Sequence, residues 1–539
     1  MPNAHNALPV CPAGGTTPPA FVVAVYGSKH AAFLAPNLTR LFTIYPALET
    51  PDTRGVLVLW QDVARREIAA LRAAFPAARF IETSFPTGTE IMHAIPRKMH
   101  AWLRGAELAI EHHPSRPVVF IDCDAMLIRP IDDLLAGDWD VMFTWKDELY
   151  PINTGVMAAR DASAAAHVFR TMLPRIERMV AHKDELATAV GSSGAADQHA
   201  LREIIGFCNY DGTFSRSVAV GPIQREIVFR GAPCRVLNET RCVPIGDFLR
   251  IVHYKTGWHP ILLDGKPFTA NRSKEACGEM FALWNDLESQ AAEGVASAVV
   301  HCGAAAAAAR FASIAGGYEE RGILHSEMLA ACGAFTSMGV DVVIESGRCR
   351  GQSTRILADF FAGSPIEIVS LELVQDENSD FAEARLAGHP NVELLYGDTT
   401  AMLPALLERF KGRRIGLLLD GPKGVAAMNL AHQAFSSSDD VAVACIHDMR
   451  IDFPQRAASA DYPFRAFFTD DAEYRRLYAH LDDACLPTGD ISMHTWRPFK
   501  KGHEDIDGYG PTLGVFLPRP SRTTQPTPAS MGIKEFIHV

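Results

Sequence analysis

Short apolar runs alternate with segments of helical spacing in the first half of the chain. The apolar runs are Phe21–Tyr26, Gly55–Trp60 and Pro117–Ile121, and the helix-like segments are Val63–Ala74 and Lys98–Glu111. Apolar runs that alternate with amphipathic helices favour a largely parallel sheet covered by helices. This pattern predicts an α/β domain over residues 20–270.

A second alternation of the same kind begins near Arg321. The strands that it predicts are Asp341–Ile344, Ile366–Leu371, Val392–Leu395, Ile415–Leu419 and Val441–Ile446, with a final pair at Ile491–Trp496 and Thr512–Leu517. We therefore predict a second α/β domain over residues 320–518. The two halves share no internal repeat, so they are expected to be different domains.

The remaining segments differ in composition from these two domains. Residues 271–319 are rich in alanine and have helical spacing over Arg272–Gln290, so we expect a helical connector there. Residues 1–19 read as a disordered leader, and the tail at 519–539 is rich in Pro, Ser and Thr. A chain of 539 residues is too long for one core, which agrees with two domains.

Charge and cysteine usage narrow the class of protein. The net charge of −12 argues against a nucleic-acid-binding protein, because phosphate neutralisation needs a basic face. The 11 cysteines are scattered singly, which favours reduced, buried thiols over disulfides or zinc sites. No apolar stretch looks long enough to span a bilayer, and the leader lacks the pattern of a signal peptide. We therefore expect a cytoplasmic protein without a transmembrane segment.

The first candidate site is a pair of carboxylates after the run Pro117–Ile121. Asp122 and Asp124 are one residue apart, and positions i and i+2 of an extended chain point to the same side. They would meet at the carboxyl edge of the sheet, where open α/β sheets bind ligands. Mg²⁺ or Mn²⁺ suits such a pair of carboxylates together with phosphate oxygens. A solvated carboxylate pair without a metal is the alternative, since so short a motif needs a supporting context.

Four further segments supply that context. Lys98–Trp102, Ile152–Met157 (INTGVM), Ala196–Gln198 and His253–Gly257 follow in a fixed order around the aspartates. Together with Asp122 and Asp124 they resemble the GT-A nucleotide-sugar glycosyltransferases, particularly their family 8 group. The resemblance covers about residues 20–270. It implies a GT-A fold, a nucleotide-sugar donor, with UDP-sugars foremost, and a divalent cation, Mn²⁺ or Mg²⁺.

The resemblance also assigns roles to individual residues. It implies that Asp122, Asp124 and His253 hold the metal, and that Asn153, Asp197 and Gln198 face the donor sugar and the acceptor. The remaining residues implied to contact the donor nucleotide and its diphosphate are Tyr26, Gly27, Lys98, Lys255 and Gly257. The lysine–proline element of the family is shifted to Lys266-Pro267 or replaced by Lys255.

Structural readings remain open beside these roles. His253 is equally well read as an ordinary core histidine. Asn153 would serve as a source of turn hydrogen bonds near Gly155. Asp197 is also a candidate helix N-cap after the preceding glycine- and serine-rich loop.

The second candidate site lies in the segment VVIESGRCRGQSTRIL, which reads as strand, glycine turn and helix. Gly347 and Gly351 allow a tight turn and a close approach to a ligand, and Ser353 or Thr354 can cap the helix. Acidic residues end four successive predicted strands: Glu372, Asp398, Asp420 and Asp448. Such regular placement at the carboxyl edge points to a ligand site.

These features resemble the class I S-adenosylmethionine-dependent methyltransferases, a Rossmann-like fold, over about residues 320–520. The resemblance implies that the cofactor is held by Glu345, Gly347, Gly351, Ser353, Glu372 and Asp398. Cys349 stands where many members have a glycine. Asp420, Lys423 and Asp448 are similar in place to positions of catechol-type, metal-dependent O-methyltransferases.

Two chemical alternatives remain at this second site. Met449 stands where the catechol-type group has an asparagine ligand, so a complete metal site is in doubt. His447 is either a general base or a spectator at a strand end. Asp420, Lys423 and His447 are the candidate catalytic residues of the second domain.

The leading hypothesis is a bifunctional transferase. The first domain would transfer a sugar, as a hexosyltransferase, to a glycan or small-molecule acceptor, and the second would methylate a hydroxyl group. The alternative is a single-activity enzyme, glycosyltransferase or methyltransferase, in which the other domain is a non-catalytic binding module. The second domain is the stronger candidate for that module because its metal positions are incomplete.

Overall fold

The computed structural model of the chain describes residues 18–49, 55–84, 94–114, 116–145, 152–182, 196–206, 210, 212–237, 245, 249–254, 258–263, 266, 277–318, 322–451, 453–485 and 512–519. These residues form two compact units. Unit 1 takes the described residues up to 63 and from 75 to 291, and unit 2 takes residues 64–74 and those from 292 to 519. Both units are α/β structures, as the sequence predicts.

Unit 1 is built on an eight-stranded sheet in the order β3-β2-β1-β4-β7-β6-β9-β8, with a separate two-stranded sheet β10-β5. The strands are β1 (Ala20–Tyr26), β2 (Val56–Gln61), β3 (Ala78–Glu82), β4 (Val118–Asp122), β5 (Ala125–Leu127), β6 (Val141–Trp145), β7 (Ile152–Ala159), β8 (Gly212–Val220), β9 (Ile223–Pro233) and β10 (Ile251–His253). Strands β3, β2, β1 and β4 are mutually parallel.

The prediction of a largely parallel sheet is wrong for the other half of this sheet. Strand β7 pairs antiparallel with both β4 and β6, and β8 pairs antiparallel with β9. Strands β8 and β9 were not predicted because many of their side chains are exposed or half-buried, so they form no long apolar run. The unit remains α/β, but its sheet is mixed.

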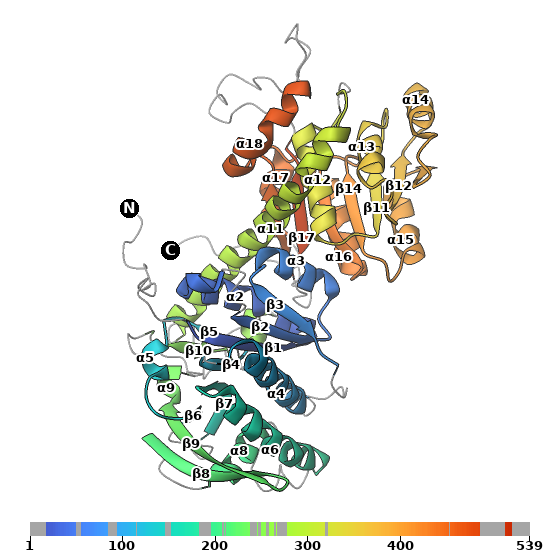
Figure 1. Ribbon diagram of the computed structural model, residues 1–539. Coiled ribbons are helices and arrows are strands. Elements are labelled where there is room, and N and C mark those ends of the chain that lie inside the picture. The colour runs from blue at the N-terminus through green and yellow to red at the C-terminus, as the bar shows by residue number, and fades with distance from the viewer. Residues whose placement is uncertain are drawn as a thin grey trace, which may run out of the picture. The chain divides into compact units, whose positions relative to one another are not determined.

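The helices of unit 1 are α1 (Gly27–Ala31), α2 (Leu34–Ile44), α4 (Ala94–His112), α5 (Asp132–Leu135), α6 (Ala162–Ala181), α8 (Ala196–Ile205), α9 (Cys234–Leu237) and α10 (His259–Leu262). Helix α4 packs against α6, and α6 packs against α8 (Figure 1). Trp102 of α4 contacts the rings of Phe120 in β4 and Phe169 in α6, at centroid distances of 5.7 and 5.9 Å. This aromatic cluster anchors β4, whose last residue is Asp122.

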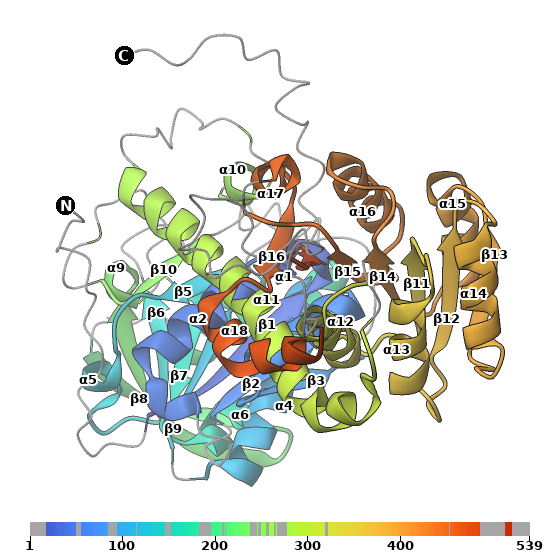
Figure 2. The same ribbon diagram turned by 90° about the horizontal axis from the view of Figure 1, so that it is seen from above.

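Unit 2 contains a seven-stranded sheet in the order β13-β12-β11-β14-β15-β17-β16. Its strands are β11 (Val342–Ser346), β12 (Glu367–Glu372), β13 (Val392–Tyr396), β14 (Ile415–Leu419), β15 (Val441–Ile446), β16 (Phe464–Phe468) and β17 (Gly514–Pro518). Figure 2 shows the five strands from β13 to β15 side by side, and all of them are parallel. Strand β17 lies antiparallel between β15 and β16.

The helices of unit 2 are α3 (Arg65–Ala74), α12 (His325–Ser337), α13 (Gln352–Phe360), α14 (Glu377–Leu386), α15 (Thr399–Arg409), α16 (Val425–Ser437), α17 (Pro454–Ala458) and α18 (Ala472–Tyr478). Five of the predicted strands match β11 to β15 within one or two residues, and Thr512–Leu517 matches β17. The prediction at Ile491–Trp496 lies outside the described residues. Strand β16 was not predicted.

Helix α11 (Gly278–Ile314) runs through the predicted connector, and its residues divide between the units after Ala291. Contrary to the expectation from sequence, the helical segment Cys277–Ile314 is by length and composition able to cross a membrane, because an 18-residue window within it has a mean hydropathy of 1.4. Core helices of soluble proteins pass the same test. Trp284 and Leu287 of α11 lie in a buried cluster of unit 1, which gives such a helix a reason to be apolar.

The cysteines follow the expectation of reduced thiols at some positions and not at others. Cys123, Cys332 and Cys445 are buried free thiols. Cys277 is disulfide-bonded, so the prediction of reduced cysteines is wrong at that position.

Candidate functional sites

The predicted metal ligands of unit 1 meet in space. One ligand atom each from Asp122, Asp124 and His253 lies within 4.8 Å of the others. Asp122 ends β4, whereas Asp124 lies in the turn between β4 and β5, so the two do not share one extended strand as the sequence argument assumed. The antiparallel pairing of β10 with β5 sets His253 opposite Ala125 and so brings the imidazole to the aspartates.

A glycine makes room for this cluster. The β6–β7 ladder shifts register between Phe143 and Thr144, next to the segment that contains Gly155. A Cβ atom at Gly155 would lie 2.5 Å from Nδ1 of His253 and 3.3 Å from Oδ2 of Asp122. Real Cβ atoms do not approach other atoms so closely, so this position requires glycine. The sequence indicated Gly155 as part of a motif but not why it is a glycine.

Lys98 lies between this cluster and Asp197, in the first turn of α8. Its Nζ lies 2.6 Å from Oδ2 of Asp197 and 3.5 Å from Oδ2 of Asp122, and 4.9 Å from the centroid of the Trp102 ring. Burial by itself would lower the pKa of Lys98, but the two carboxylates raise this pKa above its ordinary value. Thr154 also donates to Oδ2 of Asp197, at 2.6 Å. Lys98 is therefore a fixed positive charge beside the candidate metal ligands.

A second imidazole contacts Asp124. Nε2 of His259, in α10, lies 2.9 Å from Oδ2 of Asp124, while Nε2 of His253 lies 3.1 Å from Oδ1. Burial would raise the pKa of Asp124, but the two imidazoles hold this pKa well below its usual range. The turn is fixed by Asn37, whose Nδ2 donates to the carbonyl oxygens of Cys123 and Ala125 at 3.0 and 2.8 Å.

The sequence did not indicate His259 or Asn37. His259 lies only six positions after His253, just beyond the segment His253–Gly257, and that spacing was the one available signal. Nothing local marks Asn37, because it comes from α2, 86 positions before Cys123.

The other predicted residues of unit 1 differ in their surroundings. The hydroxyl of Tyr26 is buried without a hydrogen-bond partner among the described residues, and burial followed by the charge of Asp122 raises its pKa well above the usual value. Asn153 is buried and accepts a hydrogen bond from the Gly155 N–H at 3.0 Å, which is the structural reading of this residue. Gln198 follows Asp197 in the first turn of α8.

Gly27 begins α1 with φ of 73°, and a Cβ there would meet nothing within 4 Å. Glycine is therefore favoured at this position by its backbone conformation and not by crowding. Lys255 and Gly257 lie outside the described residues, as does Pro267 of the alternative lysine–proline element.

In unit 2 the glycine turn after β11 is built as predicted. Gly347 has φ of 89°, and a Cβ on it would lie 2.9 Å from N of Gly421. Gly351, with φ of 74°, immediately precedes α13. Only glycine fits the first position, because both the left-handed backbone and the neighbouring chain exclude a side chain.

Glu345 and Ser353 face inward. The Glu345 carboxyl is 1% exposed and accepts hydrogen bonds from the hydroxyls of Ser353, Thr354 and Ser370. Burial raises the pKa of this carboxyl. The network links β11, the start of α13 and β12, so these two predicted cofactor residues have structural partners within the fold.

Glu372 and Asp398 lie at the accessible carboxyl edge. Glu372 ends β12 and accepts from the backbone N–H of Cys349 at 2.7 Å. Asp398 is exposed and caps α15 by accepting from the N–H of Thr400 at 2.8 Å. Since β11, β12 and β13 are adjacent and parallel, the ends of these strands and the glycine turn lie along one edge.

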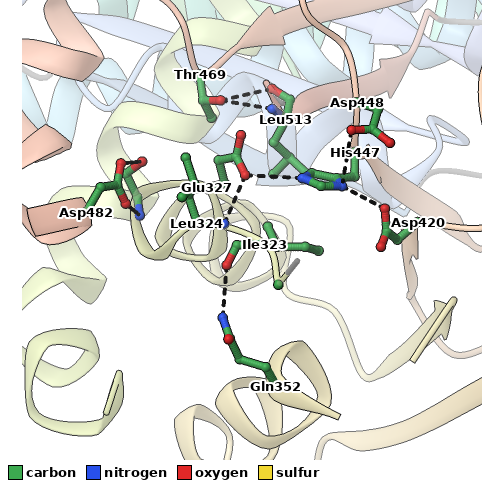
Figure 3. A network of polar contacts seen from close by, with 12 residues as sticks. Ile323, Leu324, Glu327, Gln352, Asp420, His447, Asp448, Thr469, Asp482 and Leu513 are labelled. Carbon is green, nitrogen blue, oxygen red and sulfur yellow. Dashed lines mark hydrogen bonds and ion pairs between the residues drawn. The ribbon is translucent and has the colours of Figure 1, made fainter. Parts of the chain in front are cut away.

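A second cluster of carboxylates and an imidazole lies just after the ends of β14 and β15. It is formed by Asp420, His447 and Asp448. Figure 3 shows His447 between Asp420 and Glu327. Its Nδ1 lies 2.6 Å from Oδ1 of Asp420, and its Nε2 lies 3.4 Å from Oε2 of Glu327. Burial would lower the pKa of His447, but the two carboxylates raise it to about 10. A protonated imidazole has no lone pair, so this arrangement argues against His447 as a general base.

Glu327 and Lys423 complete this cluster. Lys423 is bonded to Oδ1 of Asp420 and lies 2.6 Å from Oδ2 of Asp448. Glu327 is 3% exposed, and its carboxylate also accepts from the N–H of Leu324, at the start of α12. The sequence did not indicate Glu327, because its position resembles an ordinary helix-capping glutamate.

Comparison with known proteins gives structural neighbours but no family. No protein-family model and no curated protein matches the chain. Among solved structures, it is similar to the glycosyltransferase GlyE of Streptococcus pneumoniae TIGR4 (12% identity, 78% of this chain and 90% of that chain, TM-score 0.29). It is also similar to the galactosyltransferase LgtC in complex with donor and acceptor sugar analogues (15% identity, 50% and 95% coverage, TM-score 0.30).

A third similarity involves the O-methyltransferase TomG from Streptomyces achromogenes in complex with SAM (16% identity, 33% of this chain and 73% of that chain, TM-score 0.22). The neighbours include both classes that the sequence resembles, glycosyltransferases and methyltransferases. The assignment of two α/β units follows from the sheet topologies themselves.

Proposed function

We propose that unit 1 transfers a sugar from a nucleotide-sugar donor to a glycan or metabolite acceptor with the help of a divalent cation. The observation that carries this proposal is the convergence of Asp122, Asp124 and His253 at the carboxyl end of β4. Residues from distant parts of the sequence are held there by a strand end, a turn and a separate two-stranded sheet. The site lies where α/β sheets bind their ligands.

The donor set suits Mn²⁺ or Mg²⁺. The cluster offers two carboxylates and one imidazole, which are groups that bind such cations, and their ligand atoms lie close enough together to share one ion. The closest carboxylate to Lys98 is that of Asp197, so Lys98 does not occupy the space between Asp122 and Asp124. A bound cation would supply positive charge to a diphosphate leaving group.

The protein residues around the cluster support a donor site. Lys98 presents a fixed positive charge, and Tyr26 presents a buried hydroxyl without a partner among the described residues. A buried polar group of that kind is costly unless a ligand satisfies it. We assign Tyr26 to the nucleotide, and Asp197 and Gln198 to the sugar and acceptor side.

We further propose that unit 2 binds S-adenosylmethionine and transfers its methyl group to a hydroxyl. The glycine turn at Gly347 supports the proposal, because it leaves the backbone free to approach a ligand. Glu372 ends β12 and Asp398 lies just after β13, at the start of α15, where carboxylates can accept hydrogen bonds from a nucleoside. The sulfonium carries its own leaving group, so positioning supplies much of the catalysis.

A binding module is the second candidate function of unit 2. The observation in its favour is that the candidate base, His447, lies between Asp420 and Glu327, whose carboxylates raise the pKa of the imidazole to about 10. In that case unit 2 would bind the cofactor or a glycan without turning it over.

A donor-hydrolysis screen tests the first proposal. The full chain is incubated with UDP-, GDP- and other nucleotide sugars in the presence of Mn²⁺, Mg²⁺ or EDTA, and release of the nucleotide is measured. We expect hydrolysis of at least one donor that is lost with EDTA and in the Asp122→Asn and Asp124→Asn variants. Asp138→Asn is the matched control, since Asp138 is an exposed aspartate of the same unit. Unchanged hydrolysis in both site variants would contradict the proposal.

Titration calorimetry of the full chain with S-adenosylmethionine tests the second. We expect binding that Glu372→Ala weakens and that Glu408→Gln, a change in a surface ion pair with Lys411, leaves unchanged. Binding without methylation of any hydroxylated acceptor would favour the binding module. Absence of binding would contradict the proposed methyl transfer and leave glycan recognition as the candidate function of unit 2.

A further inference from the structure

The candidate metal cluster of unit 2 already contains a cation of the protein itself. The ammonium of Lys423 bonds to Asp420 and lies 2.6 Å from Asp448, so it bridges the two carboxylates of the cluster. The third member of the cluster, His447, directs Nδ1 at the same Asp420 oxygen, at 2.6 Å. Both possible carboxylate ligands are therefore occupied by hydrogen-bond donors.

Charge also disfavours a dication in this place. The ammonium of Lys423 contacts both Asp420 and Asp448, and the imidazole of His447 lies between Asp420 and Glu327. A divalent cation placed between the two aspartates would be in direct contact with the positive charge of Lys423, and at such short range the repulsion is strong.

The lysine of the candidate metal cluster in unit 1 is placed differently. Nζ of Lys98 lies 2.6 Å from Asp197 and 3.5 Å from Asp122, and among the described residues it has no ion pair with Asp124. Its shorter contact is with a carboxylate outside the cluster, so it does not bridge Asp122 and Asp124. The contacts to Asp124 come from the imidazoles of His253 and His259, and a neutral imidazole can turn a lone pair toward a metal, which an ammonium cannot do.

We propose that Lys423 takes the place of a divalent cation in unit 2, so that the candidate methyl-transfer site is independent of metal. Asp420 and Asp448 hold the ammonium, and His447, which Glu327 supports from its other side, orients Asp420. The Lys423 side chain is 56% exposed, and two of the three N–H bonds of its ammonium are directed at carboxylates. The third is available to an oxygen atom of the acceptor. That oxygen would bond to the methyl carbon as the carbon–sulfur bond of the sulfonium breaks, and the hydroxyl proton would pass to solvent water.

The role of Lys423 in catalysis rests on the proposed methyl transfer. The exclusion of a metal ion by Lys423 does not depend on that proposed function. Mn²⁺ binding is therefore measured first, by electron paramagnetic resonance, in full-length protein whose unit 1 cluster is removed by Asp122→Asn and Asp124→Asn. We expect no bound Mn²⁺ in this background. Adding Lys423→Ala or Lys423→Ser should create one Mn²⁺ site, and a further Asp448→Asn change should abolish it.

Lys411→Ala, a surface lysine paired with Glu408, is the control and should create no site. Lys423→Arg should create none either, because it keeps the positive charge. Circular dichroism of each variant identifies any that fails to fold, and the alanine and serine variants give two independent attempts. Mn²⁺ bound at Asp420 and Asp448 with Lys423 intact would overturn the proposal, as would failure of both folded variants to gain a site.

Methyl transfer is then measured with and without EDTA. We expect EDTA to have no effect, and Lys423→Met to lower the rate by about 100-fold, as expected when a group that positions the acceptor oxygen is lost. Lys423→Arg should restore part of the rate. Loss of methylation in EDTA would overturn metal independence, whereas no methylation under any condition would count against the proposed function and leave the Mn²⁺ result standing.

Discussion

Nε2 of His253 lies 3.1 Å from Oδ1 of Asp124, although 129 positions separate the two residues. The contact depends on the antiparallel pairing of β10 with β5, which places His253 opposite Ala125. On the other side of the same carboxylate, His259 contacts Oδ2 at 2.9 Å. Asp124 therefore bridges two imidazoles, only one of which belongs to the candidate metal cluster.

His259→Ala should weaken Mn²⁺ binding to unit 1 without abolishing it. His259 orients Asp124, and loss of such an outer partner typically costs 10–100-fold in metal affinity (about 1–3 kcal/mol). Mn²⁺ titration followed by electron paramagnetic resonance measures the change. His259→Gln, which keeps a hydrogen-bond donor, should recover part of the affinity. Equal affinity in the wild-type and alanine proteins would show that His253 alone positions Asp124.

Gly155→Ala should damage the same site by crowding. The added Cβ would lie 2.5 Å from Nδ1 of His253 and 3.3 Å from Oδ2 of Asp122, so the imidazole must move. We expect a loss of Mn²⁺ affinity and a destabilisation of about 1–3 kcal/mol. Calorimetric unfolding and Mn²⁺ titration measure both. Gly278→Ala is the control, because a Cβ at Gly278 meets nothing within 4 Å, and it should leave Mn²⁺ binding intact.

The stability of unit 2 should fall as the solution becomes alkaline. The folded protein raises the pKa of His447 to about 10 from an ordinary value of 6.5. A group whose pKa is raised by folding contributes its full stabilisation below pH 6.5 and loses it as the pH rises through about 10.

Thermal unfolding between pH 6.5 and 10 checks this expectation. The melting temperature of unit 2 should decline over this range, and the decline should be smaller in His447→Gln, which cannot titrate. Parallel pH profiles for the two proteins would show that His447 is not protonated in the folded state.

Gly333→Ala should destabilise unit 2 strongly. A Cβ at Gly333 would lie 2.5 Å from the backbone N of Ala304 in α11, so the two helices must separate. Overpacking of this kind costs about 1–3 kcal/mol. Gly294→Ala is the matched control in α11, because the added methyl group meets nothing within 4 Å, and it should be neutral or stabilising. Urea unfolding compares the two. An equal stability of both variants would contradict the close helix approach.

Much of the architecture could be predicted from local patterns. The strands β11, β12, β14 and β15 were found as short apolar runs, because parallel strands buried on both faces are largely apolar. Strand β13, at the edge of the sheet, was found as well, although its residues are only half-buried. The hairpin β8–β9 could not be found in this way, since many of its side chains remain exposed or half-buried. Strand β16 was also missed, although Phe464 and Phe467 are buried.

The candidate sites divide in a similar way. Asp122, Asp124 and His253 were indicated by their residue types and order, and the fold brings them together. Glu345 and Ser353 belong to the predicted glycine motif, yet their hydrogen bonds are made inside the fold. The side chain's direction decides between ligand and scaffold, and a strand-end position alone does not fix that direction.

By itself, the sequence determined two α/β domains, the aspartate pair after β4 and the glycine turn after β11, because these depend on local periodicity and on residues close in the chain. Only the tertiary structure decided which charges neutralise which. Lys98 and Lys423 are both lysines near aspartates, but one is bound to Asp197, outside its cluster, and the other fills its cluster. The difference is a matter of a few ångströms set by packing between distant elements, and electrostatic interactions at that range decide whether a metal can bind.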